Sequence, residues 1–391
     1  MSTTAPRHSR RPARPRRALR AAALVALAVP LFVVSAAGAT YLRLDANIDT
    51  ADGIDAYLGT SRPSASADPL VDGFAGRPLN ILVMGIDARD GDNADFAGHD
   101  DGQRSDSTFL VHLPADRSRI DIVSVPRDSL VEIPSCLLED GTQTPARASD
   151  MFNAAFQIGS GPDLNLTTAA ACTRRTFEHL TGVRTDEHVV VKMNGVRDII
   201  DTLGGVPFCL PEAMDSPKAR FKAPAGHQVF NGRQAIGFLR SRTGTGNGLW
   251  LGSDLGRLDR QHQFLVALTD KIHRARLLSK PRTLLTVLNQ ATKAISVSPG
   301  LGDLRTMAGL ANGLRGIDGA RVNAITVPTE SVEGSGRVRW TAAADDIWER
   351  INADRPLTDP APAPTGTHKA PKPSKPNPTG PKPTASAGIC G

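Results

Sequence analysis

Residues 237–261 read GFLRSRTGTGNGLWLGSDLGRLDRQ, a segment in which a glycine-rich loop separates two arginine-bearing pieces. The arginines are Arg240, Arg242, Arg257 and Arg260. Arg240 and Arg242 are two residues apart, so an extended backbone would point both side chains the same way. Asp254, Arg257 and Gln261 have the spacing of one helix face, and backbone amides at the start of that helix favour an anion. The segment therefore predicts a phosphate or pyrophosphate site, with a solvated charge run on a surface helix as the alternative.

The N-terminal segment has the composition of a membrane anchor. Residues 1–20 contain seven arginines and no acid, and residues 21–42 contain no charged side chain. A run of this length spans a hydrocarbon core at about 1.5 Å per residue. The arginines predict that the N-terminus is cytoplasmic and the large C-terminal part extracellular, in a single-pass protein of the cell membrane. The alternative is a cleaved signal peptide, since residues 37–39 (AGA) resemble a cleavage site.

Charge is unevenly distributed along the 391 residues. The whole chain carries +6, residues 1–20 carry +7 and residues 356–391 carry +3, which leaves −4 for residues 21–355. The high isoelectric point thus describes the ends of the chain and not its body. We therefore expect no nucleic-acid partner.

Between the ends, the apolar pattern predicts an α/β domain over residues 78–355. Residues 43–77 form an expected extracellular linker, and the proline- and lysine-rich residues 356–391 an expected disordered tail. Buried strands are expected at 79–85, 108–113, 120–125, 187–192 and 320–327. Helices are expected at 152–159, 167–180, 195–203, 232–239, 254–278, 281–289, 301–314 and 342–351. Gly182 is the expected stop of the second helix, Asn194 and Asn231 are expected caps, and residues 207–224 are expected at the surface.

Three carboxylates, Asp87, Asp106 and Asp128, follow or precede expected strands. Ligands collect beyond the carboxyl ends of strands in α/β sheets. Carboxylate oxygens suit a hard divalent cation such as Mg²⁺, which usually binds together with phosphate oxygens. An aspartate in a turn is also commonly present for turn geometry alone.

The four cysteines are Cys136, Cys172, Cys209 and Cys390. Their spacing contains no CxxC pair, which makes a zinc or redox site improbable. An even number in an exported protein favours disulfides, with three possible connectivities. Our first expectation is Cys136 with Cys172, which leaves Cys209 for Cys390.

At this point the sequence resembles the LytR–CpsA–Psr family of bacterial cell-envelope proteins. The matching pieces are LNILVMGID (79–87), RSDSTFLVHL (104–113), IVSVPRDSLVEIP (122–134), FNAAF (152–156), VRTDEHVVVKMNGVRDIIDTLGGV (183–206), APAGHQVFNGRQAIGFLRSR (223–242) and SDLGRLDRQ (253–261). They occur in the family's order behind a single N-terminal anchor and cover most of residues 78–270.

The resemblance implies a central mixed sheet flanked by helices, with a hydrophobic groove for a polyprenyl chain. It further implies a magnesium-dependent phosphotransferase (Mg²⁺ or Mn²⁺) that acts in cell-wall biogenesis. Such an enzyme moves a glycopolymer from polyprenyl pyrophosphate to the C6 hydroxyl of N-acetylmuramic acid in peptidoglycan. The product is a phosphodiester, and polyprenyl phosphate is released.

The resemblance also assigns roles to individual residues. Arg127, Arg240, Arg242 and Arg257 would hold the pyrophosphate, with Arg104 and Gln261 beside them. Asp87 and Asp106 would bind the metal, whereas Asp128 either reaches the metal or holds Arg127. Arg127 and Asp254 are the expected catalytic residues. From residue type alone, a carboxylate such as Asp87, Asp106 or Asp254 could accept the proton of the acceptor hydroxyl.

Three other functions stay open on the sequence. A non-catalytic or regulatory binder of polyprenyl pyrophosphates would use the same anchor and arginines, and a hydrolase would use water in place of the sugar hydroxyl. A DNA-binding regulator is disfavoured by the acidic body and its expected position outside the membrane.

Overall fold

The computed structural model describes residues 15–64, 76–86, 104–247, 249, 254–317 and 321–357. The chain divides into two units, residues 1–46 and 47–391. The first unit contains helix α1 (Pro15–Asp45), in which residues 22–45 are apolar and long enough to cross a membrane. This helix is the candidate membrane anchor, and an N-terminal signal sequence would have the same length and composition.

The second unit is built on a seven-stranded mixed sheet, in agreement with the expected α/β class. The strand order is β1 (Asp49–Thr50), β12 (Ile295–Val297), β7 (Glu187–Lys192), β2 (Leu79–Ile86), β3 (Ser105–Leu113), β4 (Ile120–Val125) and β13 (Val322–Thr326). The central strand β2 is parallel to β7 and antiparallel to β3, and β4 is parallel to β13. Strands β2, β7, β4 and β13 consequently all end at the edge of the sheet where β3 begins.

One face of this sheet carries the main core. Leu82, Met84, Leu110 and Val123 alternate toward this face and are fully buried. They pack against helices α4 (Ala154–Ser160), α5 (Leu166–Thr181) and α11 (Ala343–Asn352). Helix α5 ends at Gly182, as expected, because this glycine has a positive φ of 64° and its N–H caps the Glu178 carbonyl. The Cys136–Cys172 disulfide, also expected, joins α5 to the segment after β5 (Leu130–Ile133).

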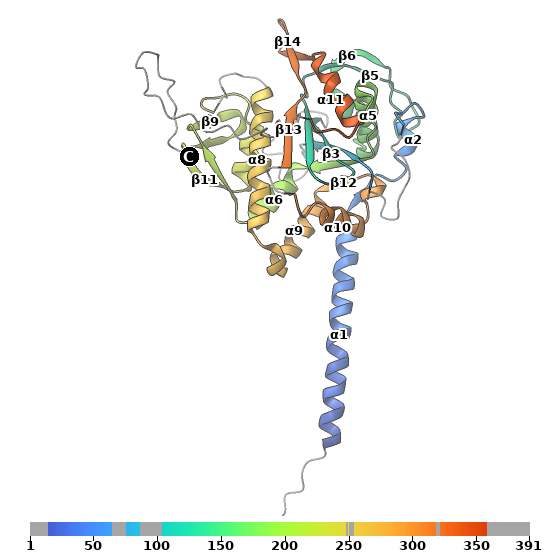
Figure 1. Cartoon of the computed structure of the whole chain (residues 1–391), viewed down its shortest axis with the longest axis vertical. Helices are drawn as coiled ribbons and strands as arrows, with labels where there is room; N and C mark the ends of the chain where they lie inside the picture. Colours follow the sequence, from blue (N-terminus) through green and yellow to red (C-terminus); the bar gives the residue numbers. More distant parts are fainter. Residues whose placement is uncertain are drawn as a thin grey trace, which may run out of the picture. The chain divides into compact units, whose positions relative to one another are not determined.

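The opposite face of the sheet is apolar and unevenly covered. Leu79, Ile81 and Leu113, where β2 begins and β3 ends, are buried together with Val297 and Leu301. Val83, Phe109, Val111, Ile122 and Val189 all keep intermediate exposure. Helices α8 (Asp254–Arg274), α9 (Pro281–Lys293) and α10 (Leu304–Gly313) belong to this side of the molecule, and α8 stands beside β13 (Figure 1). The apolar side chains of α10 are likewise half-buried. Fully packed cores leave few voids, so the part of this face that carries these half-buried side chains is loosely covered by the described residues.

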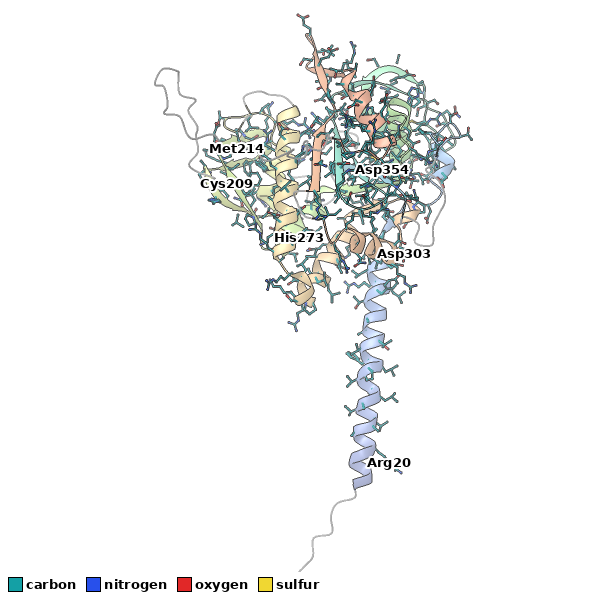
Figure 2. All side chains as sticks on the ribbon, in the orientation of Figure 1. Arg20, Cys209, Met214, His273, Asp303 and Asp354 are labelled. Atoms are coloured by element: carbon teal, nitrogen blue, oxygen red, sulfur yellow. A yellow bond between two sulfur atoms is a disulfide. The ribbon has the colours of Figure 1, made fainter. Side chains whose placement is uncertain are left out.

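A second core lies across α8 from the central sheet (Figure 1). It is enclosed by α6 (Met193–Thr202), α7 (Gly232–Arg240) and the hairpins β8 (Val206–Leu210) with β11 (Gly226–Phe230) and β9 (Met214–Ser216) with β10 (Phe221–Ala223). Its centre is a cluster of phenylalanine rings: Phe208, Phe221, Phe230, Phe238 and Phe264. Cys209 and Met214 belong to the part of the domain that surrounds this second core, whereas Asp354 lies by the central sheet (Figure 2).

The surface position expected for residues 207–224 is therefore wrong. Phe208, Leu210, Met214 and Phe221 are all buried. Pro211, Pro217 and Pro224 each follow the last residue of a short strand, and Pro207 lies within β8 with its side chain exposed, so the prolines do not expel these strands from the core. The cap expected at Asn194 is also wrong, since α6 begins at Met193 after Lys192. Asn231 does cap α7, in a reciprocal capping box with Gln234.

The remaining elements are α2 (Asp55–Leu58) and the small sheets of β5 with β6 (Arg147–Met151) and of β14 (Thr329–Val332) with β15 (Arg337–Trp340). The start of the expected linker at 43–77 belongs to the folded domain, because β1 joins the central sheet and Ile54 and Leu58 are buried. Residues 65–75, and the expected tail from 358 onward, lie outside the described residues. Cys209 is disulfide-bonded. Its expected partner, Cys390, is likewise outside the described residues.

Candidate functional site

The candidate site lies at the sheet edge where β4 ends and β3 begins. Thr108 is paired with Val125, so the backbone of Asp106 comes opposite Arg127, just beyond the last ladder pair. A one-residue slip of this register would turn Asp106 to the other face of the sheet. The antiparallel pairing thus places the PRD segment (126–128) next to the RSDS segment (104–107).

Three guanidinium groups from different elements meet at Asp106. Arg127 Nη1 donates to Asp106 Oδ1 at 2.6 Å, and Arg242 Nη2 donates to the same oxygen at 3.3 Å. Arg257, on α8 and buried, donates from Nη2 to the Asp106 carbonyl oxygen at 2.7 Å. Among the described residues, three positive charges thus meet at Asp106, two at its carboxylate and one at its backbone carbonyl. Such a group favours a further anion, and the planar guanidinium fork matches phosphate oxygens.

A second layer of side chains holds these arginines in place. Asp128 contacts Arg127 Nε at 3.6 Å and Arg337 Nη1 at 3.3 Å. The position of Asp128 therefore fits the expectation that it holds Arg127. Arg104, at the other end of the segment, donates from Nε to Gln157 Oε1 at 2.7 Å and lies at the exposed margin.

Arg260 is a supporting residue to which the sequence analysis gave no role. It is buried and donates to the Ser241 carbonyl at 2.7 Å and to the Asn247 carbonyl at 3.2 Å. It thereby ties α8 to the segment that carries Arg242. The sequence offered one indication of this role, because Arg260 lies between Arg257 and Gln261 in the same motif. However, the spacing of a buried arginine that binds backbone carbonyls does not distinguish it from an arginine that binds a ligand.

Gln261 and His262 join α8 to the central sheet. Gln261 Nε2 donates to the Ser107 hydroxyl at 2.9 Å, and His262 Nε2 lies 2.7 Å from Ser124 Oγ on β4. Burial lowers the pKa of His262, with Asp259 opposing the shift, so the ring is neutral at pH 7. The His262 ring is thus directed at the sheet and not at Asp106.

Arg240 is separated from the Asp106 group. It is the last residue of α7, Ser241 is extended, and Arg242 then turns to Asp106. The extended backbone from which a common direction was inferred is therefore wrong for this pair. Arg240 instead lines a cleft between α6 and α7, where burial lowers the pKa of its guanidinium.

The described residues do not by themselves form the expected metal site. They contain no group of three His, Cys, Asp or Glu side chains placed to hold an ion. Asp106 Oδ1 already accepts from two guanidiniums. The other expected ligand, Asp87, lies outside the described residues. Asp254 is the first residue of α8, but its side chain also falls outside what the structure describes.

Comparison with known proteins identifies the family. Residues 47–354 match the model of the LytR_cpsA_psr family, and the chain belongs to this family. It is 30% identical over 281 residues to the probable cell wall biosynthesis protein LcpB of Corynebacterium glutamicum, covering 70% of this chain and 59% of that protein. The chain thus spans little more than half the length of that relative.

Two further relatives cover the same domain. The polyisoprenyl-teichoic acid–peptidoglycan teichoic acid transferase TagU of Oceanobacillus iheyensis is 26% identical, over 71% of this chain and 74% of its own length. The crystal structure of Bacillus subtilis TagV superposes with a TM-score of 0.51 at 22% identity, covering 71% of this chain and 97% of that one. The likeness to TagV confirms the fold, a mixed sheet flanked by helices.

Proposed function

We propose that this protein transfers a glycopolymer from a polyprenyl-pyrophosphate carrier to peptidoglycan in cell-wall biogenesis. The acceptor is the C6 hydroxyl of N-acetylmuramic acid, the bond formed is a phosphodiester, and polyprenyl phosphate leaves. Family membership and the transferase names of relatives such as TagU support a glycopolymer–peptidoglycan transferase.

The observation that carries the proposal is the meeting of Arg127, Arg242 and Arg257 at Asp106. A pyrophosphate brings several negative charges, and its transfer builds more charge on the leaving phosphate. Phosphoryl transfer depends mainly on positioning and electrostatic stabilisation, which preformed guanidiniums supply. Arg104, at the exposed margin, and Gln261, on α8, are further proposed contacts of the pyrophosphate. Arg240 stays in the proposal through its place in the family motif, although it lines a cleft between α6 and α7.

The half-buried apolar sheet face supports the proposed lipid groove. Val83, Phe109 and Val111 lie on β2 and β3, the strands whose ends carry the site. A polyprenyl chain buried there would gain about 25 cal/mol for each Å² of apolar surface removed from water. The pyrophosphate would then lie at the sheet edge, with its lipid directed along the sheet.

The proposed reaction is a single displacement. The acceptor oxygen bonds to the phosphorus that carries the glycan, and the bridging bond to polyprenyl phosphate breaks. The arginines stabilise the negative charge that collects on the departing phosphate. The hydroxyl proton passes to a carboxylate, for which we propose Asp254, so that no covalent enzyme intermediate is required.

We also propose that Mg²⁺ or Mn²⁺ accompanies the substrate, with Asp87 and Asp106 as ligands. This proposal rests on residue type and on the resemblance of the RSDS and MGID segments to the family. When bound, the ion would neutralise phosphate charge. Removal of divalent ions with EDTA is expected to abolish transfer, and added Mg²⁺ to restore it; full turnover in EDTA would refute the metal requirement.

The apolar helix α1 supports a single-pass anchor with an extracellular catalytic domain. This position brings the site to the polyprenyl carrier and to the cell wall. Protease added to intact cells should digest the C-terminal domain. Protection of this domain from the protease would contradict the proposed orientation.

The deciding experiment is product analysis with the full-length protein in detergent, a polyprenyl-pyrophosphate-linked oligosaccharide and peptidoglycan. The expected products are polyprenyl phosphate and a muramic acid phosphodiester. Release of polyprenyl phosphate without acceptor modification would indicate hydrolysis. Binding of the lipid without any release, with and without Mg²⁺, would indicate a non-catalytic binder.

A further inference from the structure

A cleft of about 430 Å³ lies between α6 and α7 and is lined in part by Arg240, two residues before Arg242 of the candidate site. We refer to it as the α6–α7 cleft. Its charged lining consists of Arg197, Asp198, Asp201, Arg220, Arg233 and Arg240. The short 3-10 helix η2 (Pro217–Ala219), which precedes Arg220, closes one side.

The lining of the cleft is electropositive. Four arginines face two aspartates, and both aspartates already have roles within the fold. Asp198 pairs with Arg197 at 2.9 Å, and Asp201 Oδ1 accepts from the Gly232 N–H at 2.7 Å, which fixes the start of α7. The carboxylates therefore anchor the walls, and the positive charge of the lining exceeds theirs by two.

The first turn of α6 adds a second feature that favours an anion. Met193 and Asn194 open this helix and line the cleft. The side chain of the N-cap residue, Lys192, makes no capping hydrogen bond within the described part of the chain, and the first turn contains no acid. Backbone amides at a helix start carry partial positive charge and attract anionic groups. The helix start and the arginines thus act in the same direction.

Chain connectivity joins the cleft to the proposed pyrophosphate site. Arg240 lines the cleft, and Arg242, two residues later, contacts Asp106. Arg260 fixes the residue between them through the Ser241 carbonyl. A glycan attached to a pyrophosphate bound at Arg242 therefore has only a short distance to span to the α6–α7 cleft.

We propose that the α6–α7 cleft is a subsite for an anionic glycan, a saccharide that carries a phosphate or carboxylate group. This inference rests on the proposed function, because it assigns the sugar side of the same reaction. The anionic group belongs either to the donor glycopolymer or to the peptidoglycan acceptor, and both present the same chemistry to the arginines. The cleft would select charged over neutral glycans.

The test compares the full-length protein with an Arg197→Gln/Arg233→Gln double variant, neither residue being in the proposed pyrophosphate site. Three lipid-free probes are titrated: a glycerol-phosphate hexamer, a soluble disaccharide-peptide fragment of peptidoglycan, and neutral chitotetraose. The double variant should bind one anionic probe about tenfold more weakly, the size expected from losing charge-assisted hydrogen bonds. Chitotetraose binding should be unchanged.

The matched control is Arg282→Gln/Arg339→Gln, which removes two exposed arginines outside the cleft. This control removes the same net charge and should leave all three affinities unchanged. A weaker glycerol-phosphate interaction in the cleft variant alone assigns the subsite to the donor, and a weaker disaccharide-peptide interaction assigns it to the acceptor. If the anionic probes bind equally weakly to the cleft variant and the control variant, the effect comes from the net charge of the protein, and the proposal is overturned.

Absence of binding of both anionic probes to the wild-type protein would also overturn it. The transfer assay separates this failure from failure of the proposed function. With an anionic donor, the cleft variant should raise KM about tenfold with little change in kcat, provided the donor carries the group. If the wild-type protein transfers nothing, the proposed function fails, whereas the probe titrations still decide on the cleft.

Discussion

Two arginine clusters of this domain differ in how their charge is used. Arg174, on α5, is almost wholly buried and donates to Thr185 Oγ1 at 2.9 Å and to the Thr185 and Asp186 carbonyls at 2.5 and 3.0 Å. Its neighbour Glu178 accepts two hydrogen bonds from Arg62, at 2.6 and 2.8 Å. At the candidate site, by contrast, three guanidiniums converge on Asp106, whose carboxylate is more than one-third exposed.

The difference separates a structural cluster from the proposed binding cluster. In the first, burial lowers the pKa of Arg174 to about 10, and backbone carbonyls fix its guanidinium. In the second, the charges sit at a sheet edge that a ligand can reach, with positive charge in excess among the described residues. Mutations of the two clusters should therefore affect different properties, stability in one case and catalysis in the other.

Arg174→Met should produce the largest change in stability. It leaves several buried carbonyl and hydroxyl oxygens without a donor, which costs roughly 3–5 kcal/mol of unfolding free energy. Urea unfolding of the full-length protein measures the loss. An unfolding midpoint equal to that of the wild type would show that the α5 cluster is not structural.

Arg127→Gln should lower transfer by about 10²–10³-fold, because it removes a preorganised donor from the phosphate site. Its unfolding midpoint should stay near that of the wild type, since Arg127 is part of a partly exposed group. Steady-state turnover and urea unfolding of the same preparation measure both. Loss of folding together with activity would erase the distinction between the clusters.

Arg260→Met should have an intermediate effect, because Arg260 combines burial with support of the site. We expect about a tenfold fall in kcat/KM and a loss of about 1–3 kcal/mol of unfolding free energy from the freed Ser241 and Asn247 carbonyls. Leu239→Met, at the buried end of α7, is a control for packing alone. Full activity in the arginine variant would remove Arg260 from the positioning role.

The smallest expected effect is a change in the pH dependence of the unfolding free energy. Burial alone would raise the pKa of Glu178, but hydrogen bonds from Arg62 and Thr185 outweigh it, and the net pKa is lowered from 4.5. A lowered pKa means that Glu178 stabilises the fold above pH 4.5 and that this contribution disappears as the pH falls through the folded value. In the Glu178→Gln variant, the unfolding free energy should therefore fall less steeply than in the wild type as the pH is lowered from 7 to 3.

Glu187 provides the contrast for that experiment. Burial raises its pKa, despite the hydrogen bond from Ser298 and the nearby Arg174. The folded state therefore holds the Glu187 proton more tightly, and its contribution weakens as the pH rises. Glu187→Gln should change the pH dependence in the opposite direction; identical curves for the two variants would contradict the assignment.

Much of the sheet and of the site could be predicted from local pattern. The strands β2, β3, β4 and β7 and the helices from α4 to α11 follow apolar runs and glycine stops such as Gly182, whereas α2 lies in the expected linker. The short strands β8 to β10 could not, because three to five residues with prolines carry no clear period. Their burial depends on the phenylalanine cluster, which assembles residues from 208 to 264.

The sequence by itself indicated the family, the α/β class, the apolar N-terminal helix and the arginines that are candidates for the site. It left three cysteine pairings open, and the structure contains the first expected one, Cys136–Cys172. Only the tertiary structure decided which of those arginines act together. Antiparallel pairing of β3 with β4 brings Asp106 to Arg127, and the end of α7 sends Arg240 into the α6–α7 cleft while Arg242 turns to Asp106. Spacing in the chain fixes direction only within one regular element, and residues 240–242 cross the boundary where a helix ends.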